Sequence, residues 1–229
     1  MSTQGAHFNA AAWLLDRHVD EGRGDRVAIR CQGRSTTYAE VLDRARAVQA
    51  LLADHGIEAG DRVAMVVRDD ETFPAFFLGA LRSGVVPVPL STMLTGAELA
   101  PIVADADARL LVVSEVFNGA VDEVKAGAPA LEAVLVADDA PTTPAGAPPA
   151  VADTTGDSPG FWLYSSGTTG VPKGVMHTHG NLPATVETYA AQVLEVGPDD
   201  RFLSVAKLFF AYGLGNSLTF PFAVGGTAV

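Results

Sequence analysis

Residues 164–174 read Tyr164-Ser165-Ser166-Gly167-Thr168-Thr169-Gly170-Val171-Pro172-Lys173-Gly174. Short apolar runs that are typical of strands flank this stretch, at 161–164 and 174–177. Glycine lets the backbone approach a ligand closely, so that its N–H groups can point at an anion, and the serine and threonine hydroxyls add further donors. Lys173 adds a positive charge. The stretch therefore predicts a loop that joins two adjacent strands and binds a polyphosphate.

The residues of this loop are also compared with two other loop types. A Walker A loop needs Gly directly before the Lys and Ser or Thr directly after it, whereas Pro172 and Gly174 stand at these positions. A glycine-rich surface hairpin would use the same residue types, because Gly, Ser, Thr and Pro are common in turns. The residues thus favour a phosphate loop of another kind, with a plain hairpin as the alternative.

The stretch resembles the signature of the adenylate-forming superfamily, which includes acyl- and aryl-CoA ligases, firefly luciferase and the adenylation domains of peptide synthetases. That signature begins with Tyr or Phe and ends in Pro-Lys-Gly, and every fixed position is matched here. The resemblance implies an enzyme that activates a carboxylic acid with ATP and Mg²⁺ and transfers the acyl group to coenzyme A. It assigns the β- and γ-phosphates to Ser165, Ser166, Gly167, Thr168, Thr169, Gly170 and Lys173. The hydroxyl of Thr168 or Thr169 is then the expected partner of the metal-bound phosphates.

A second stretch reads Lys207-Leu208-Phe209-Phe210-Ala211-Tyr212-Gly213-Leu214-Gly215-Asn216. Taken alone, its aromatic residues are typical of core filling, whereas glycines on both sides of Leu214 indicate a tight backbone beside a flat ligand. The stretch resembles the acyl-binding motif of the same superfamily, and most closely that of the benzoate–CoA ligase branch. The resemblance implies an acid pocket formed by Phe210, Ala211, Tyr212 and Gly213, in which the small Ala211 leaves room for an aromatic ring.

Several alternatives to a benzoate–CoA ligase are compatible with these residues: a broader acyl-acid ligase, an acyl-AMP ligase with a carrier-protein acceptor, or a non-catalytic nucleotide-binding fragment. The superfamily's adenine and ribose motifs, its hinge and its catalytic lysine do not occur in the 229 residues, and we assign no catalytic residue. The chain stops within the strand-like run 225–229. We therefore expect the N-terminal fragment of a larger enzyme, inactive alone, whose truncated surface could support self-association.

Two histidines and one cysteine are candidates for other chemistry. His177 and His179 have the spacing of two side chains on one strand face, but no third ligand lies at a recognisable spacing, and we assign no metal ligand among the protein side chains. Cys31 is the single cysteine, so it cannot form an intrachain disulfide. This cysteine usage favours the cytoplasm.

Composition restricts the partners of the chain. A net charge of −12 argues against a nucleic-acid surface, which needs clustered Lys and Arg. The apolar runs are broken by Gly, Pro or charged residues before they reach membrane-spanning length, and the start of the sequence lacks the pattern of a signal peptide. The expected partner is a small carboxylic acid, most simply an aryl acid, in a cytoplasmic enzyme with 48% hydrophobic residues.

The order of strand and helix signals predicts the fold class. Strands are expected at 27–31, 62–67, 110–113, 134–136 and 202–206, separated by helices, and Thr37–Glu40 and Thr95–Glu98 have capping-box spacing. This alternation predicts an α/β fold with layered sheets flanked by helices. We expect an N-terminal α/β subdomain over 1–137, a Pro/Ala/Thr-rich linker or long loop over 138–160, and an incomplete second α/β subdomain over 161–229.

Overall fold

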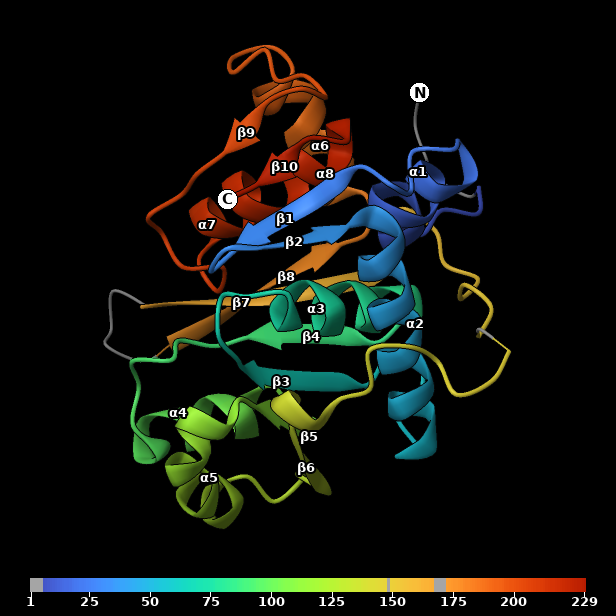
Figure 1. Ribbon diagram of the computed structural model, residues 1–229. Coiled ribbons are helices and arrows are strands. Elements are labelled where there is room, and N and C mark those ends of the chain that lie inside the picture. Colours follow the sequence, from blue (N-terminus) through green and yellow to red (C-terminus); the bar gives the residue numbers. More distant parts are fainter. Residues whose placement is uncertain (1–5, 148, 167–171) are drawn as a thin grey trace.

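A four-stranded parallel sheet occupies the lower half of the molecule (Figure 1). The computed structural model describes residues 6–147, 149–166 and 172–229. The strand order is β4 (Val86–Pro89), β3 (Arg62–Val66), β5 (Ala108–Val113) and β6 (Ala133–Val136). Side chains alternate between the two faces: Met65 belongs to one hydrophobic core and Val66 to the other.

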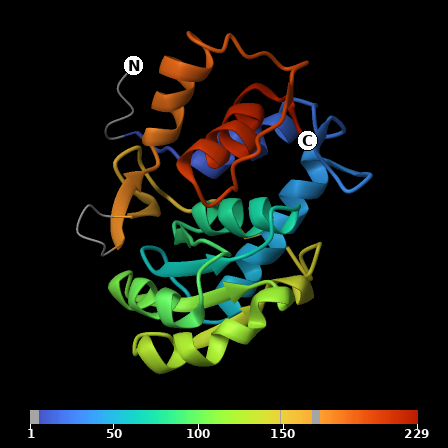
Figure 2. The same cartoon turned by 90° about the vertical axis from the view of Figure 1, so that its left-hand side faces the viewer.

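Helices cover both faces of this sheet, as the two views show (Figures 1 and 2). One face packs against α2 (Tyr38–Asp54) and α3 (Thr72–Arg82). The other packs against α4 (Gly96–Asp105), the 3-10 turn η2 (Glu115–Ala120) and α5 (Val121–Gly127). Layered α/β structure is thus confirmed.

Both predicted capping boxes are present. Thr37 N donates to Glu40 Oε2 at 2.7 Å, and Glu40 N donates back to Thr37 Oγ1 at 3.3 Å. At the start of α4, Thr95 and Glu98 repeat this exchange at 2.9 and 3.4 Å. Each box satisfies N–H groups that the first helical turn leaves without an intrahelical partner, which fixes where the helix begins.

The second sheet combines strands from distant parts of the chain. Its order is β2 (Arg34–Thr37), β1 (Val27–Cys31), β10 (Thr227–Ala228) and β9 (Arg201–Phe202). The strand predicted at 202–206 is observed as Arg201–Phe202, with two residue pairs in its ladder with β10. The division at residue 137 stays a prediction, and this sheet joins residues from both sides of it.

The loop stretch lies between β7 (Pro159–Ser166) and β8 (Pro172–Thr178), which pair antiparallel. The prediction that two adjacent strands flank the loop is therefore confirmed. The remaining helical segments are η1 (Ala12–Asp16), α1 (Arg17–Asp20), η3 (Ala137–Asp139), α6 (Asn181–Thr185), η4 (Val186–Ala190), α7 (Ala211–Leu214), η5 (Gly215–Thr219) and α8 (Phe220–Val224). Three sets of neighbours run on as continuous helices: η1 with α1, α6 with η4, and α7 with η5 and α8.

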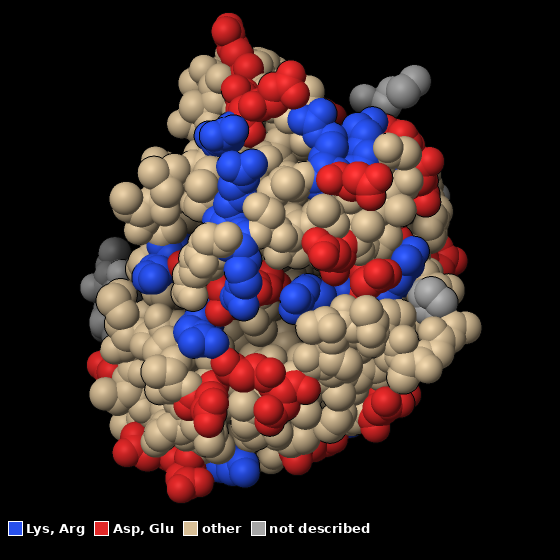
Figure 3. Space-filling model, in the orientation of Figure 1, with Lys and Arg blue, Asp and Glu red and all other residues tan. Residues whose placement is uncertain are grey.

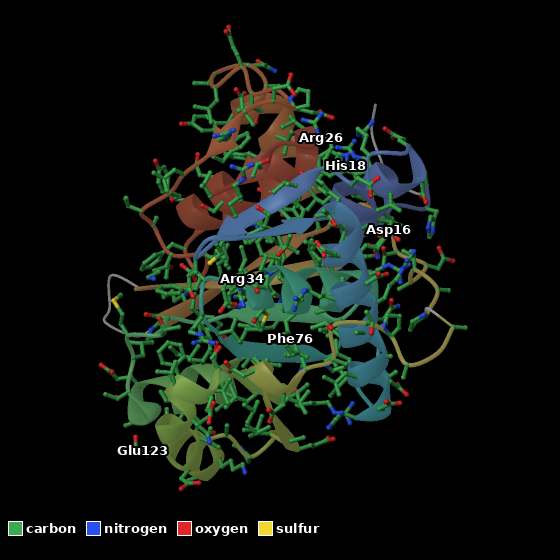
Figure 4. All side chains as sticks on the ribbon, in the orientation of Figure 1. Asp16, His18, Arg26, Arg34, Phe76 and Glu123 are labelled. Carbon is green, nitrogen blue, oxygen red and sulfur yellow. The ribbon has the colours of Figure 1, made fainter. Side chains whose placement is uncertain are left out.

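A buried ion pair anchors the Pro-rich segment. Arg82 Nη2 donates to Asp16 Oδ1 at 3.0 Å, and both side chains are buried. Arg82 Nη1 also donates to the carbonyl oxygen of Pro149 at 2.7 Å, and Ala152 N donates to Arg82 O at 2.9 Å. Asp16 and His18 lie beside the upper end of α2, and Phe76 of α3 lies over the parallel sheet (Figure 4). The segment around 149–152 is therefore fixed to the core rather than free.

The surface carries charges of both signs in close proximity. On the face shown in Figure 3, Lys and Arg side chains stand beside Asp and Glu. Arg34 pairs with Glu71 at 2.7 Å, and Arg68 pairs with Asp138 at 2.6 Å. Within the described ranges, no helix has the length and apolar character needed to cross a membrane.

Candidate functional site

The end of the β7–β8 hairpin carries the first group of predicted site residues. Ser165 lies opposite Lys173 in the strand register, and both side chains are exposed. Ser166 is the last residue of β7 and pairs with Pro172. The predicted contacts at Gly167, Thr168, Thr169 and Gly170 lie outside the described residues. The hairpin thus places a hydroxyl and an ammonium side by side where the loop begins and ends.

The sequence of β7 explains how the hairpin is held. Phe161 and Leu163 belong to the core on the α3 side, whereas Trp162 and Tyr164 pack against the core on the α4 side. This alternation is that of a strand with both faces covered. The close packing continues across the hairpin, since a Cβ on Gly174 would lie 3.0 Å from Tyr164 Cζ. A larger residue at 174 would disturb the Tyr164 ring.

The second predicted segment turns sharply before α7. Phe210 has an extended backbone (φ −93°, ψ 145°) and Ala211 begins the helix. A Cβ on Gly213 would overlap the carbonyl oxygen of Lys207, so only glycine fits there without movement of the backbone. Leu208 N donates to Asp69 Oδ2 at 3.3 Å, and burial raises the pKa of the Asp69 carboxyl. The segment is therefore fixed to the carboxyl end of β3.

A cavity of about 670 Å³ lies between the two segments. Its wall includes Ser165 of the hairpin and Phe210 and Ala211 of the second segment. The rest of the wall is mostly apolar, with Leu90, Val175 and His177 among its residues. A volume of this size and an apolar wall with a few polar groups are typical of small-molecule sites. Two segments that are distant in sequence thus contribute to one pocket.

Ala211 stands between this cavity and a smaller one of about 110 Å³. Leu163 and His177 also line both cavities. A larger side chain at position 211 would enter the space where the two cavities meet. Ala211 therefore occupies a position from which it can limit the size and shape of a ligand.

Not all predicted residues lie on the wall of the large cavity. Among the described residues of the two segments, Lys173, Tyr212 and Gly213 are not part of that wall. Tyr212 is 64% exposed and Phe210 47% exposed. The roles assigned to these side chains remain predictions.

The two histidines of this region make structural contacts. His179 is fully buried, its Nδ1 accepts from Ala10 N at 3.0 Å, and burial lowers its pKa to about 4. The ring of His177 stacks on Phe161 with centroids 4.6 Å apart, and burial lowers the pKa of His177 as well. The described part of the chain contains no group of three or more His, Cys, Asp or Glu side chains that could hold a metal.

Sequence reasoning missed several residues around the pocket. Leu90 follows β4, and Val175 and His177 lie on one face of β8, so only the folded chain brings these two strands to one pocket. One feature of the sequence could have indicated a role for Asp69. It follows β3 closely, and the carboxyl ends of parallel strands are where α/β folds place functional residues.

Comparison with known proteins identifies the family of the chain. Residues 15–229 match the model of the family described as AMP-binding enzyme. The chain is 39% identical to the 4-hydroxybenzoate–CoA/benzoate–CoA ligase of Rhodopseudomonas palustris, covering 97% of this chain and 43% of that protein. It is 41% identical to the benzoate–CoA ligase of Thauera aromatica, covering 97% of this chain and 44% of the relative.

A solved structure gives the same result. A benzoate CoA ligase from Burkholderia xenovorans superposes with a TM-score of 0.86 at 39% identity, covering 96% of this chain and 45% of the solved chain. The present chain therefore spans less than half the length of the relatives it matches. Because the family model matches residues 15–229, nearly the whole chain, the chain belongs to the AMP-binding enzyme family.

Proposed function

We propose that this chain forms the phosphate- and acid-binding part of an enzyme that activates an aryl carboxylic acid with ATP and passes it to coenzyme A. The observation that carries the proposal is the shared cavity, whose wall includes Ser165 next to the phosphate loop and Phe210 and Ala211 of the second segment. A phosphate-binding group and an apolar ring pocket must lie this close if a carboxylate is to meet a phosphorus atom. The benzoate-activating relatives support an aryl acid.

The reaction has two displacements. A carboxylate oxygen attacks the α-phosphorus of ATP, and the bond to pyrophosphate breaks to leave an acyl-adenylate. The thiol of coenzyme A, having lost its proton, then attacks the acyl carbon, and AMP leaves. In this chain the hairpin residues bind and orient phosphates, because they offer a charge and donors with little cost of reorganisation. Mg²⁺ would neutralise charge on the phosphates, with Thr168 or Thr169 as the proposed hydroxyl partner.

The setting of this activity is also a proposal. The lone Cys31 is half-buried in a strand, as expected of a small apolar residue in a reducing compartment. We infer a cytoplasmic enzyme that acts on a small-molecule acid. Self-association through exposed apolar side chains is a further expectation, argued below.

Replacement of Lys173 by Ala tests the phosphate role. The chain offers a matched control, Lys125→Ala, because Lys125 is an exposed lysine of α5 outside both motifs. Isothermal titration with pyrophosphate and with MgATP should show a loss of about 10- to 100-fold in affinity for Lys173→Ala, as for a charge-assisted contact. Lys125→Ala should bind like the unchanged chain. Equal affinities for the two variants would contradict the assignment.

The acid is tested separately, in the longest gene product that contains this chain. Acid-dependent ATP–pyrophosphate exchange should favour benzoate and hydroxybenzoates over medium-chain fatty acids. Ala211→Leu should reduce the aryl-acid rate by about 10-fold or more, because one wall of the pocket advances into the space for the ring. Preference for fatty acids, or no effect of Ala211→Leu, would favour the broader acyl-acid ligase.

A further inference from the structure

Tyr164 connects the phosphate-loop hairpin to a helix of the parallel-sheet half. Its hydroxyl donates to Asp105 Oδ2 at 2.6 Å. Asp105 is the last residue of α4, the helix that begins at the Thr95–Glu98 capping box. The two residues are distant in sequence, so this bond forms only when the hairpin docks against α4.

The ring of Tyr164 is fixed independently of its hydroxyl. It packs against the core on the α4 side, and Gly174 of β8 lies directly over it. Burial and the neighbouring Asp105 both raise the pKa of the Tyr164 phenol, so the hydroxyl remains protonated and donates at neutral pH. A Phe at this position would keep the packing and lose only the hydrogen bond.

The position of this bond in the strand register gives it its importance. Tyr164 pairs with Gly174, and the next pair toward the loop is Ser165 with Lys173. The hydrogen bond to Asp105 therefore lies one residue pair away from Ser165 and Lys173, the two described side chains that we assign to phosphate. A tilt of the hairpin on α4 would move these two side chains, and among the described residues the Tyr164–Asp105 bond is the only hydrogen bond that joins β7 to α4.

We propose that Tyr164 is a positioning residue, whose hydroxyl, held by Asp105, sets the orientation of the hairpin and thereby aims Ser165 and Lys173 at the phosphates. This inference rests on the proposed function and deepens it. The Tyr164 side chain also lines the large cavity, and its hydroxyl is engaged by Asp105. It acts through the rigidity of the hairpin, and its loss costs affinity because the ligand must then order the hairpin on binding.

The test compares four variants with the unchanged chain. Tyr164→Phe and Asp105→Ala remove the bond, whereas Asp105→Asn keeps a side-chain carbonyl oxygen that can accept it. Tyr38→Phe is the matched control. The Tyr38 hydroxyl is buried and donates to Gly226 O at 2.8 Å and Pro221 O at 3.2 Å, so its removal affects stability but not the hairpin.

Two measurements are made on each variant: pyrophosphate affinity by titration calorimetry, and amide hydrogen exchange of 159–166 and 172–178. Tyr164→Phe and Asp105→Ala should each lower the affinity about 3- to 10-fold and accelerate hairpin exchange by a similar factor, the range of one ordinary hydrogen bond. The double variant should lose no more than either single variant. Asp105→Asn should recover most of the affinity, and Tyr38→Phe should bind normally despite a lower unfolding temperature.

The outcomes separate the two proposals. Unchanged affinity in Tyr164→Phe would overturn the positioning role, and so would an affinity loss equally large in Tyr38→Phe. If the unchanged chain binds neither pyrophosphate nor MgATP, the proposed function fails for this chain. Hydrogen exchange then tests whether the bond holds the hairpin. Faster exchange in Tyr164→Phe that is confined to the hairpin supports this role, and uniform exchange overturns it.

Discussion

The parallel-sheet lobe (residues 62–136) and the motif-bearing part (residues 159–229) differ in how completely they cover their own apolar side chains. Among the described residues, the lobe exposes only Met93 and Val116 as large hydrophobics. The motif-bearing part exposes ten: Val175, Met176, Tyr189, Val193, Leu194, Leu203, Val205, Phe210, Tyr212 and Val229. Helices cover both faces of the lobe's sheet.

This difference indicates which part of the molecule stabilises the other. The lobe closes its core with its own strands and with α2 to α5, so it can serve as a rigid support. The motif-bearing part owes its order to side chains that reach into the lobe's cores, such as Phe161 and Trp162. Ligand-binding segments commonly come from the less stable regions of a fold. Four measurements can break or sharpen the comparison.

Phe77→Ala should have the largest effect, because Phe77 joins the two parts. It is fully buried in α3, stacks on Phe73 at 5.9 Å and meets the Phe161 ring of β7 edge-on at 5.5 Å. Truncation leaves a cavity on the contact surface and should lower the free energy of unfolding by about 3–5 kcal/mol. Urea unfolding measures this, with Met93→Ala, 72% exposed, as the control within about 0.5 kcal/mol. A loss below about 1 kcal/mol would mean that the two parts are not coupled through this ring.

Acidification should weaken the motif-bearing part before the lobe. Above pH 6.5, His179 is neutral in both the folded and the unfolded chain. Below it, the unfolded chain gains a proton that the folded chain does not accept until about pH 4, since burial lowers the pKa of His179 to that value. The free energy of unfolding therefore falls between about pH 6.5 and 4, by up to about 3 kcal/mol.

The lobe contains no histidine, so the acid effect should be local. Amide exchange at pH 7, 6 and 5 should show the hairpin and 211–224 opening before β3–β6. His179→Asn, which keeps an acceptor for Ala10 N, should reduce the slope of stability against pH, and His55→Gln, at an exposed position, should not. The same slope in all three proteins would contradict this assignment.

Gly213→Ala tests the tight turn of the second segment. Because a Cβ would overlap the carbonyl oxygen of Lys207, the backbone must move, and we expect a loss of about 1–3 kcal/mol. Gly119→Ala is the matched control, since nothing lies within 4 Å of its added Cβ. Thermal unfolding compares the two. If both variants have the same melting temperature, the second segment is looser than the structure indicates.

The smallest effect on stability is expected from Leu203→Ser with Val205→Ser. These side chains are 77% and 96% exposed, so the free energy of unfolding should change by less than about 0.5 kcal/mol. Self-association should decrease, because apolar side chains in water favour contact between copies. Sedimentation velocity over a range of concentrations measures it, with Met93→Ser as the control on the lobe. If the unsubstituted chain is monomeric at all concentrations, the expectation of self-association is wrong.

Local signals in the sequence were sufficient for the parts of the fold that depend on local chemistry. The capping boxes at Thr37 and Thr95, the parallel α/β layering and the paired strands around the loop are all present. The strand expected at 202–206 ends at Phe202, and its partner β10 lies more than 20 residues further along the chain. A pattern within one strand does not contain that information.

The candidate site shows the same limit on what the sequence alone can predict. Sequence identified the two segments, and the structure brings Ser165, Phe210 and Ala211 to one cavity. The contacts that hold them, Tyr164 with Asp105 and Leu208 with Asp69, join residues far apart in the chain. Neither Asp105 nor Asp69 belongs to either motif, so their roles follow only from the folded arrangement.

The pairing of β1 with β10 has a consequence for how the chain reaches this structure. Ile29 of β1 lies beside Ala228 of β10, whereas every strand pair of the lobe closes within residues 62–136. Contacts between distant residues form slowly, because a long loop must first be closed. During synthesis, the lobe can therefore fold while β1 still lacks its neighbour. We expect a late, slow kinetic phase in which β1, β10 and β9 assemble, and until then the edge of β1 is open to wrong partners.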